Sequence, residues 1–272
     1  RPGDQGTRPG NGIGSMNTIG RFLEFSVRAP DILESLNFYK SLGFVEHEIN
    51  DVLPHKYAVV SDGDINIGLQ DREFAPPAGT FVQPVLAKHA VTMADHGFDF
   101  TVMQLSDEVF NVLGFPDRDG HMITMLEART FHASDDVELV SLLGSFFELA
   151  LPVREALQAA RFWAPIAPAL LDMREEPTMH MRFDAGGAPL GLSESIALDT
   201  PSLCFKCPDR KGLKAHLKHR GIEYQKFPGF EGAFVAIQAP EGTSLFVFDK
   251  DFLGEAYEVD ETGRYDALPP LD

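Results

Sequence analysis

The sequence predicts an α+β protein that arose by tandem duplication, with two βαβββ modules in each copy. Residues 21–44 alternate apolar and polar side chains and then place apolar residues at helical spacing, which is typical of a strand followed by a packed helix. Residues 147–163 repeat this pattern, and Glu148 follows Glu24 by 124 positions (148 − 24 = 124). Other pairs keep an offset of 123 or 124: Gly68 and Gly191, Thr80 and Cys204, Gly97 and Gly221.

The first module begins with the alternating strand and continues through a helix to three more strands. Over residues 21–28 the alternation predicts a half-buried strand with Phe22 and Glu24 on the same side. Asp31 is a suitable N-cap for a helix over 31–42, which a glycine ends. Three short strands complete the module: 45–50, 56–61 and 65–70.

The other three modules repeat this order of elements after a proline-containing linker at 71–79. The second module has a helix at 85–96 and strands at 80–83, 98–105, 109–115 and 121–126. The third has a helix at 155–163 and strands at 145–151, 179–183 and 189–193. The fourth has a helix at 208–220 and strands at 203–207, 224–227, 233–238 and 244–248.

Domain boundaries follow from the repeat and from local composition. We expect an N-terminal domain over 16–130 and a C-terminal domain over 144–250, joined by a linker at 131–143. Residues 1–15 are rich in Gly and Pro and precede the first methionine, so we expect a disordered-type leader that is not native. Residues 251–272 form an acidic tail.

Charge and composition exclude several classes of partner. With 23 basic and 41 acidic residues the net charge is −18, which repels phosphate backbones and anionic lipid heads. We therefore expect no nucleic-acid partner and no membrane partner. There is no secretory signal and no apolar run of the roughly 18 residues that a membrane span needs, so we expect a cytoplasmic protein. Cys204 and Cys207 fall on opposite sides of a predicted strand, which favours buried free thiols.

Three features of the sequence occur together: four βαβββ modules, an aromatic pair before Leu42-Gly43-Phe44, and a turn at 117–120 ahead of a last strand. In this combination the chain resembles the vicinal oxygen chelate superfamily, which includes glyoxalase I, bleomycin resistance proteins and extradiol ring-cleaving dioxygenases. The resemblance covers residues 20–130 and, more weakly, 144–250. It implies tandem glyoxalase-like domains in which each pair of modules curls a mixed sheet into a cup that binds ligand.

Metal enzymes of this superfamily place their ligands on the first and last strands of the modules. By this resemblance the first-strand positions are Glu24, Glu148, Ser202 and the vicinity of Ala78. The last-strand positions are Gly68, Thr124, Gly191 and Phe246. Only the two glutamates could bind a metal ion, whereas a stable divalent site needs about three converging donors. We therefore expect no cofactor, and the pattern disfavours a divalent metal.

Glu24 and Glu148 are the candidate catalytic residues. Inside an apolar cup, desolvation raises the pKa of a carboxyl group and suits it to proton transfer. The alternative is a structural glutamate that reaches solvent or pairs with a neighbouring arginine. The expected ligand-binding residues combine polar strand positions with part of the aromatic content of 22 phenylalanines: Phe22, Phe81, Thr124, His180, Arg182 and Phe246.

We therefore interpret the chain as a protein that binds a small hydrophobic or aromatic molecule in a cup without a complete metal centre, as bleomycin resistance proteins sequester their ligand. One alternative is an isomerase, lyase or ring-cleaving dioxygenase-like enzyme in which Glu24 or Glu148 is a general base or a metal ligand. Another is a structural or assembly protein whose cups are filled by side chains. The sequence is also compatible with a homodimer.

Overall fold

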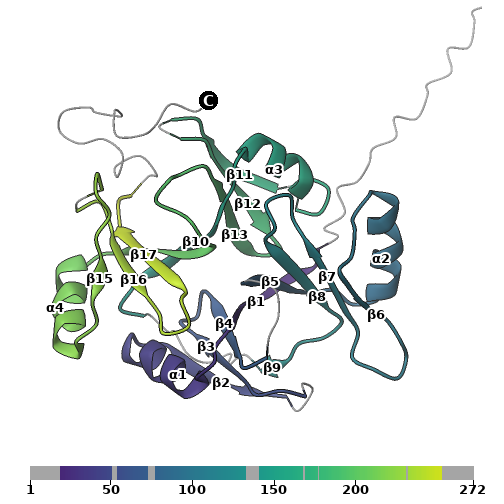
Figure 1. The fold of residues 1–272 in the computed structure, drawn as a ribbon, viewed down its shortest axis with the longest axis horizontal. Helices are drawn as coiled ribbons and strands as arrows, with labels where there is room; N and C mark the ends of the chain where they lie inside the picture. Colours follow the sequence, from purple (N-terminus) through teal and green to yellow (C-terminus); the bar gives the residue numbers. More distant parts are fainter. Residues whose placement is uncertain are drawn as a thin grey trace, which may run out of the picture.

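Two mixed β-sheets, one from each half of the chain, form the frame of the protein (Figure 1). The computed structural model describes residues 19–50, 54–72, 77–132, 141–167, 169–176, 178–230 and 232–252. Within these residues each sheet joins two modules through their first strands, which pair antiparallel. This arrangement confirms the predicted α+β class and the four βαβββ modules.

The N-terminal sheet has the strand order β6-β7-β8-β5-β1-β4-β3-β2-β9. Strand β1 is parallel to β4, and β5 is parallel to β8. The last strand of each module therefore pairs with the first strand of the same module. The elements are β1 (Arg21–Arg28), α1 (Ile32–Ser41), β2 (Val45–Ile49), β3 (Tyr57–Ser61), β4 (Asn66–Gln70), β5 (Ala78–Val82), α2 (Leu86–Asp95), β6 (Val102–Gln104), β7 (Val112–Pro116), β8 (Met122–Leu126) and β9 (Phe131–His132).

The C-terminal sheet repeats this topology in the order β11-β12-β13-β10-β14-β17-β16-β15. Strands β10 and β13 are parallel, as are β14 and β17. The elements are β10 (Ser145–Pro152), α3 (Ala156–Trp163), β11 (Ala169–Arg174), β12 (His180–Ala185), β13 (Ala188–Ser193), β14 (Ser202–Cys207), α4 (Arg210–Arg220), β15 (Tyr224–Gln225), β16 (Val235–Gln238) and β17 (Ser244–Asp249).

Each of the four helices that the sequence predicts begins within two residues of its predicted start. Asp31 caps α1 by accepting a hydrogen bond from the Glu34 backbone N–H at 3.0 Å, and Asp209 caps α4 through the Gly212 N–H at 2.9 Å. Gly43 follows α1 with a φ of 95°, a conformation that favours glycine. None of the helices in the described part of the chain has the length and apolar character needed to cross a membrane.

Alternating side chains give each sheet two different faces. On β1, Phe25 and Val27 enter one large apolar core that both halves share, whereas Glu24 and Ser26 lie on the opposite, concave face. On β10, Leu149 enters the same shared core. Two smaller apolar clusters lie on the concave faces, one in each half. We call the concave side of the N-terminal sheet cup 1 and that of the C-terminal sheet cup 2.

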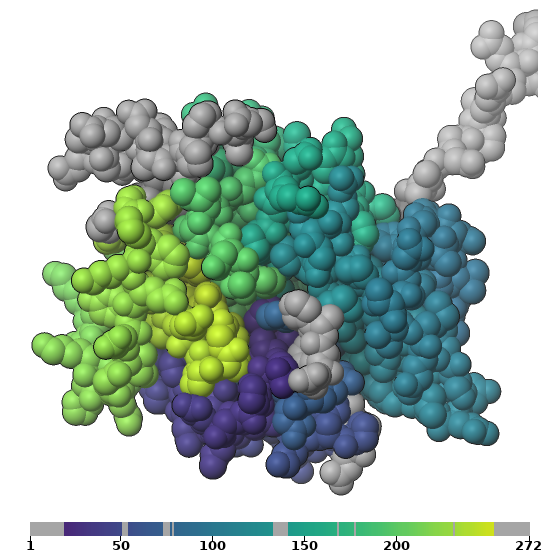
Figure 2. Space-filling view, viewed as in Figure 1, coloured from purple at the N-terminus to yellow at the C-terminus, as the bar shows by residue number. Residues whose placement is uncertain are grey.

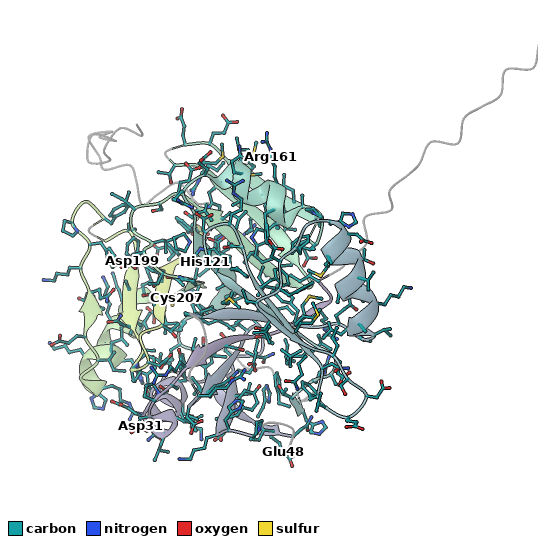
Figure 3. The ribbon with its side chains drawn as sticks, turned by 45° about the vertical axis from the view of Figure 1, so that its right-hand side comes forward. Asp31, Glu48, His121, Arg161, Asp199 and Cys207 are labelled. Atoms are coloured by element: carbon teal, nitrogen blue, oxygen red, sulfur yellow. The ribbon has the colours of Figure 1, made fainter. Side chains whose placement is uncertain are left out.

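The two halves meet crosswise, so that the first module contacts the fourth and the second contacts the third (Figure 2). On α1, the hydroxyls of Tyr39 and Ser35 donate hydrogen bonds of 2.6 and 2.7 Å to the carboxylate of Glu241 in the β16–β17 turn. His121, near the centre of the molecule in Figure 3, donates from Nε2 to the Pro152 carbonyl oxygen at 2.7 Å. The halves therefore pack as one body with a common core.

A buried carboxyl at the junction of the halves makes stability depend on pH. Asp62 is 2 % exposed, and its Oδ2 accepts a 3.2 Å hydrogen bond from Ser141. Burial raises the pKa of Asp62 from 3.8 to about 6, although backbone N–H groups that bond to it lower the value. A raised folded-state pKa means that the contribution of this group is full below pH 3.8 and is lost as pH rises through about 6.

We expect Asp62→Asn to remove this pH dependence. The free energy of unfolding of the unmodified protein should fall between pH 4 and 7 relative to that of the variant, by up to about 3 kcal/mol for a shift of about two pKa units. Urea unfolding across that range measures the difference. The exposed Asp107→Asn variant is the control, and parallel stability curves for Asp62→Asn and unmodified protein would contradict the expectation.

Several sequence expectations about elements need correction. Strand β11 was not predicted, because Ala169–Arg174 is an edge strand whose residues are mostly exposed and show no clean alternation. Residues 131–143 are not only a linker, since β9 pairs with β2 there. The predicted strand at 98–105 is reduced to β6. The expected leader at 1–15 and most of the acidic tail at 251–272 lie outside the described residues.

Candidate functional site

The two equivalent glutamates, Glu24 and Glu148, lie at matching positions in the two cups. Each lies on the first strand of its half, two residues before the residue that pairs with a glycine on the neighbouring parallel strand. A Cβ atom on Gly68 would stand 2.1 Å from Glu24 Oε1, and one on Gly191 would stand 2.7 Å from the Glu148 carboxylate. The glycines therefore leave the space in which each carboxyl group lies.

The partner of each glutamate comes from the equivalent strand but differs in chemistry. Tyr57 on β3 donates its hydroxyl hydrogen to Glu24 Oε2. Its counterpart on β12 is His180, whose Nε2 lies 3.0 Å from Glu148 Oε2 in a hydrogen bond. The offset between these partners is 123 (180 − 57 = 123). The two halves thus share the carboxyl group but differ in its partner, which is a phenol in cup 1 and an imidazole in cup 2.

In cup 1 both oxygens of Glu24 are held by other side chains. Ser26 Oγ donates to Oε1 at 2.5 Å, and Tyr57 holds Oε2. Burial raises the pKa of Glu24, while the hydrogen bonds from Ser26, Tyr57 and Gln70 and the charge of Arg72 lower it. The cup holds a cavity of about 310 Å³ that Thr124 also lines. Glu24 therefore belongs to a closed hydrogen-bond network.

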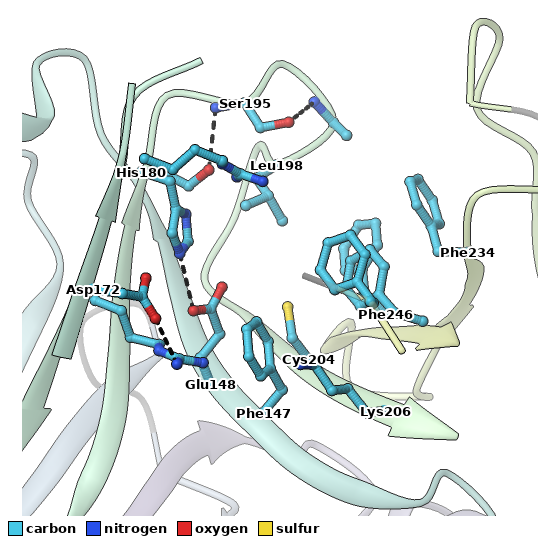
Figure 4. Close-up of a pocket in the computed structure, with 16 residues that line it drawn as sticks. Phe147, Glu148, Asp172, His180, Ser195, Leu198, Cys204, Lys206, Phe234 and Phe246 are labelled. Atoms are coloured by element: carbon cyan, nitrogen blue, oxygen red, sulfur yellow. Dashed lines mark hydrogen bonds and ion pairs between the residues drawn. The ribbon is translucent and has the colours of Figure 1, made fainter. Parts of the chain in front are cut away.

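In cup 2 the carboxylate has fewer side-chain hydrogen bonds than in cup 1, and aromatic side chains line the cavity (Figure 4). Its cavity has a volume of about 190 Å³. Glu148 and His180 lie on one side, and Phe234 and Phe246 lie opposite them. Among the described residues, His180 is the one that forms a side-chain hydrogen bond with the Glu148 carboxylate. Five phenylalanines line the cavity: Phe147, Phe234, Phe246, Phe248 and Phe252.

Charged side chains also enter cup 2 from three strands. Arg182 on β12 forms an ion pair with Asp172 on β11, with 2.6 Å between Nη2 and Oδ2. The guanidinium carbon of Arg182 lies 4.3 Å from the centre of the Phe147 ring, and Lys206 Nζ on β14 lies 4.2 Å from the same centre. Cup 2 can therefore hold a flat molecule between aromatic rings and fixed charges.

The structure separates the expected site residues into three groups. Glu24 and Thr124 line cup 1. Glu148, His180, Arg182 and Phe246 line cup 2. Phe22 and Phe81 line neither cup; their rings pack edge to face, 5.4 Å apart, where the two halves meet.

Phe22 lies outside cup 1 because the alternation of β1 is interrupted, and Phe81 lies outside it because it follows Thr80, which lines the cup, on β5. The pairing of β1 with β5 shifts between Phe22 and Glu24, which is a β-bulge. Phe22 therefore packs against the shared core, while Leu23 lies in the cluster of cup 1. The same shift recurs in β10, so that Phe147 rather than Phe146 lines cup 2.

The expected metal positions on the second modules also need correction, by two residues. Thr80 and Cys204, rather than Ala78 and Ser202, pair with the glutamates and line the cups. In cup 2 the matched set is then Glu148, Cys204 and Phe246.

These three residues do not fit a divalent metal centre. Phe246 has no donor atom, and burial followed by the charge of Glu148 raises the pKa of the Cys204 thiol, whereas a metal binds the thiolate. Over the described ranges, no three His, Cys, Asp or Glu side chains are grouped to hold a metal ion. Both cysteines are buried and free, as the sequence predicts.

Sequence reasoning missed several residues of cup 2. Asp172 lies on the unpredicted strand β11, and Phe234 follows a loop whose course the sequence pattern does not reveal. Lys206 could have been found, because it lies two residues after Cys204 on the same strand and so shares its face.

Comparison with solved structures relates the fold to ring-cleaving dioxygenases. A catechol 2,3-dioxygenase superimposes with a TM-score of 0.53 at 13% identity over 83% of this chain and 91% of its own. The 2,2',3-trihydroxybiphenyl 1,2-dioxygenase from Sphingomonas wittichii gives 0.55 at 14% identity, covering 86% and 93%. An extradiol ring-cleaving dioxygenase from B. fuscum gives 0.54 at 14% identity, covering 90% and 74%. No protein-family model and no curated protein matches the sequence. The likeness shows a shared fold.

Proposed function

We propose that cup 2 binds a single-ring aromatic molecule and that Glu148, held by His180, moves a proton on it, as in an isomerase or tautomerase. The observation that carries this proposal is the buried Glu148 carboxylate, hydrogen-bonded to His180, on the floor of a cavity with phenylalanine walls. Of the sequence interpretations, it develops the enzyme alternative, which the likeness to ring-cleaving dioxygenases favours over sequestration.

The size of the cavity supports one ring rather than several. A cavity of about 150 Å³ with apolar walls binds benzene, and cup 2 has about 190 Å³. Phenylalanine rings contact a flat ligand through offset or edge-to-face packing. A bound ring would displace water from beside Glu148, which strengthens the interaction of the carboxylate with the bound molecule.

The proton transfer requires Glu148 alone as the reacting group. Its carboxylate takes a proton from a carbon next to a carbonyl group, and the electron pair of that C–H bond forms a C=C bond. The carbonyl π electrons move to oxygen, which then takes the proton from the Glu148 carboxyl. The product is the enol, with atoms and charge balanced. His180 fixes the carboxylate through Oε2, so that it acts as a positioning residue.

Deuterium exchange tests the proposal directly. Phenylpyruvate and phenylacetone each carry a benzylic CH₂ group beside a carbonyl, and NMR in D₂O follows the loss of its protons. We expect the protein to accelerate exchange of at least one compound in proportion to protein concentration. Binding without exchange would contradict the catalytic part and support sequestration, while neither binding nor exchange would contradict the whole proposal.

A ring-cleaving dioxygenase is the second candidate, and the structural likeness is the observation that favours it. Catechol offered to the protein with ferrous iron in air tests it through oxygen consumption and the absorbance of a ring-opened product. Because the residues at the matched positions do not fit a metal centre, we expect no ring cleavage above the rate of iron alone.

A further inference from the structure

Cationic side chains line cup 2 in a protein whose net charge is −18. Arg182 and Lys206 lie in the cavity together with the carboxylates of Glu148 and Asp172. A partly buried cation without a carboxylate partner needs a physical reason, because burial of an unpaired charge costs free energy.

Lys206 is such a cation. Arg182 is paired with Asp172, and Glu148 is bonded to His180, whereas no described carboxylate forms an ion pair with Lys206. Burial lowers the pKa of Lys206, and the nearby charge of Arg182 lowers it further, while Glu148 and Asp172 raise it. The ammonium group thus lies near a second cation over the Phe147 ring.

The other half of the chain shows that the fold does not need these cations. Lys206 pairs with Ser145 as Val82 pairs with Arg21 in the N-terminal sheet. Arg182 pairs with Gly191 as Val59 pairs with Gly68. Valine therefore occupies both equivalent positions in cup 1, which indicates that the cations serve cup 2 itself.

We infer that the ligand of cup 2 is an aromatic monocarboxylate whose carboxylate binds Lys206 and Arg182 while its ring lies among the phenylalanines. One carboxylate has two oxygens and can accept hydrogen bonds from both cations. Arg182 still has an unpartnered Nε atom in this part of the structure, so it can donate to an anion without leaving Asp172. This inference rests on the proposed function, because it names the substrate class of the same site.

A matched pair of ligands tests the charge requirement. Phenylacetate and 2-phenylacetamide have nearly the same shape, and isothermal titration measures their affinities. We expect phenylacetate to bind at least tenfold more tightly, with an affinity that falls as salt concentration rises. In the exchange experiment, phenylpyruvate should likewise react faster than the neutral phenylacetone at low concentration.

Lys206→Met is the informative variant, because the equivalent Val82 shows that an apolar side chain is accepted at this position. We expect it to weaken phenylacetate binding about tenfold and to change 2-phenylacetamide binding less than twofold. Lys214→Met, on α4 and outside the cup, is the control.

Equal affinity for the two compounds, or an unchanged phenylacetate affinity in Lys206→Met, would overturn the inference and leave the proposed function standing. If neither compound bound and neither ketone exchanged, the proposed function would fail and this inference with it.

Discussion

Replacing Glu148 with glutamine is expected to lower the protein-dependent rate of benzylic proton exchange in phenylpyruvate by at least about a hundredfold, the usual contribution of a positioned base. The amide keeps the shape of the side chain and can still bond to His180, but it cannot accept the proton. The affinity for phenylpyruvate should stay or rise, because the substitution removes a negative charge beside a bound anion.

A lower exchange rate at unchanged phenylpyruvate affinity distinguishes a catalytic role of Glu148 from a purely structural one. Glu223→Gln, on the surface, should exchange at the unmodified rate. Glu24→Gln, the same change in cup 1, reports which cup reacts, since loss of exchange there would move the reaction to the N-terminal half. Exchange by Glu148→Gln at the unmodified rate, with urea unfolding also unchanged, would exclude Glu148 as the base.

His180 offers a second comparison within the same site. The equivalent residue in cup 1 is a tyrosine that holds its glutamate in a closed network with Ser26. An imidazole in that place can change its hydrogen-bonding role when its partner gains or loses a proton, whereas a phenol is mainly a donor near neutral pH. Because the two glutamates have different partners, we expect Glu148 rather than Glu24 to act as a base.

The sequence alone was sufficient to predict the duplication and to identify the two candidate glutamates. A constant offset needs no knowledge of packing, and alternation along one strand places Glu24 opposite the core residues Phe25 and Val27. The aromatic wall could not be obtained in this way. A β-bulge before each glutamate reverses the facing of Phe22, and a bulge leaves no mark in a pattern of apolar and polar residues.

The lining of cup 2 was also beyond sequence reasoning for a topological reason. Asp172 comes from an edge strand that lacks alternation, and its position depends on pairing with Arg182 across β12. The register of β14 against β10 places Cys204 beside Glu148, whereas spacing from the resemblance favoured Ser202. Pairing register depends on contacts between distant segments, so that an error of two residues moves a site residue along the cup without changing its face.

Gly68→Ala is expected to destabilise the protein by about 3 kcal/mol, because the new methyl group would occupy the place of the Glu24 carboxyl. The clash of 2.1 Å forces that carboxyl away from Ser26 and Tyr57, and both donors then lose a buried acceptor. Urea unfolding measures the loss. Gly97→Ala is unsuitable as a control because its φ of 83° adds strain, whereas Gly114→Ala has a milder 3.1 Å approach to Val102.

Gly191→Ala separates stability from function in the other cup. Its clash with Glu148 is 2.7 Å, and the hydrogen bond to His180 is the one that would be lost, so we expect about half the destabilisation of Gly68→Ala. Proton exchange should nevertheless fall by at least about tenfold, because a small displacement of the base is costly to catalysis. Gly68 is therefore needed for the hydrogen bonds of Glu24 in cup 1, whereas Gly191 is needed to keep the Glu148 carboxylate beside the cavity of cup 2. Full exchange activity in a folded Gly191→Ala protein would contradict that division.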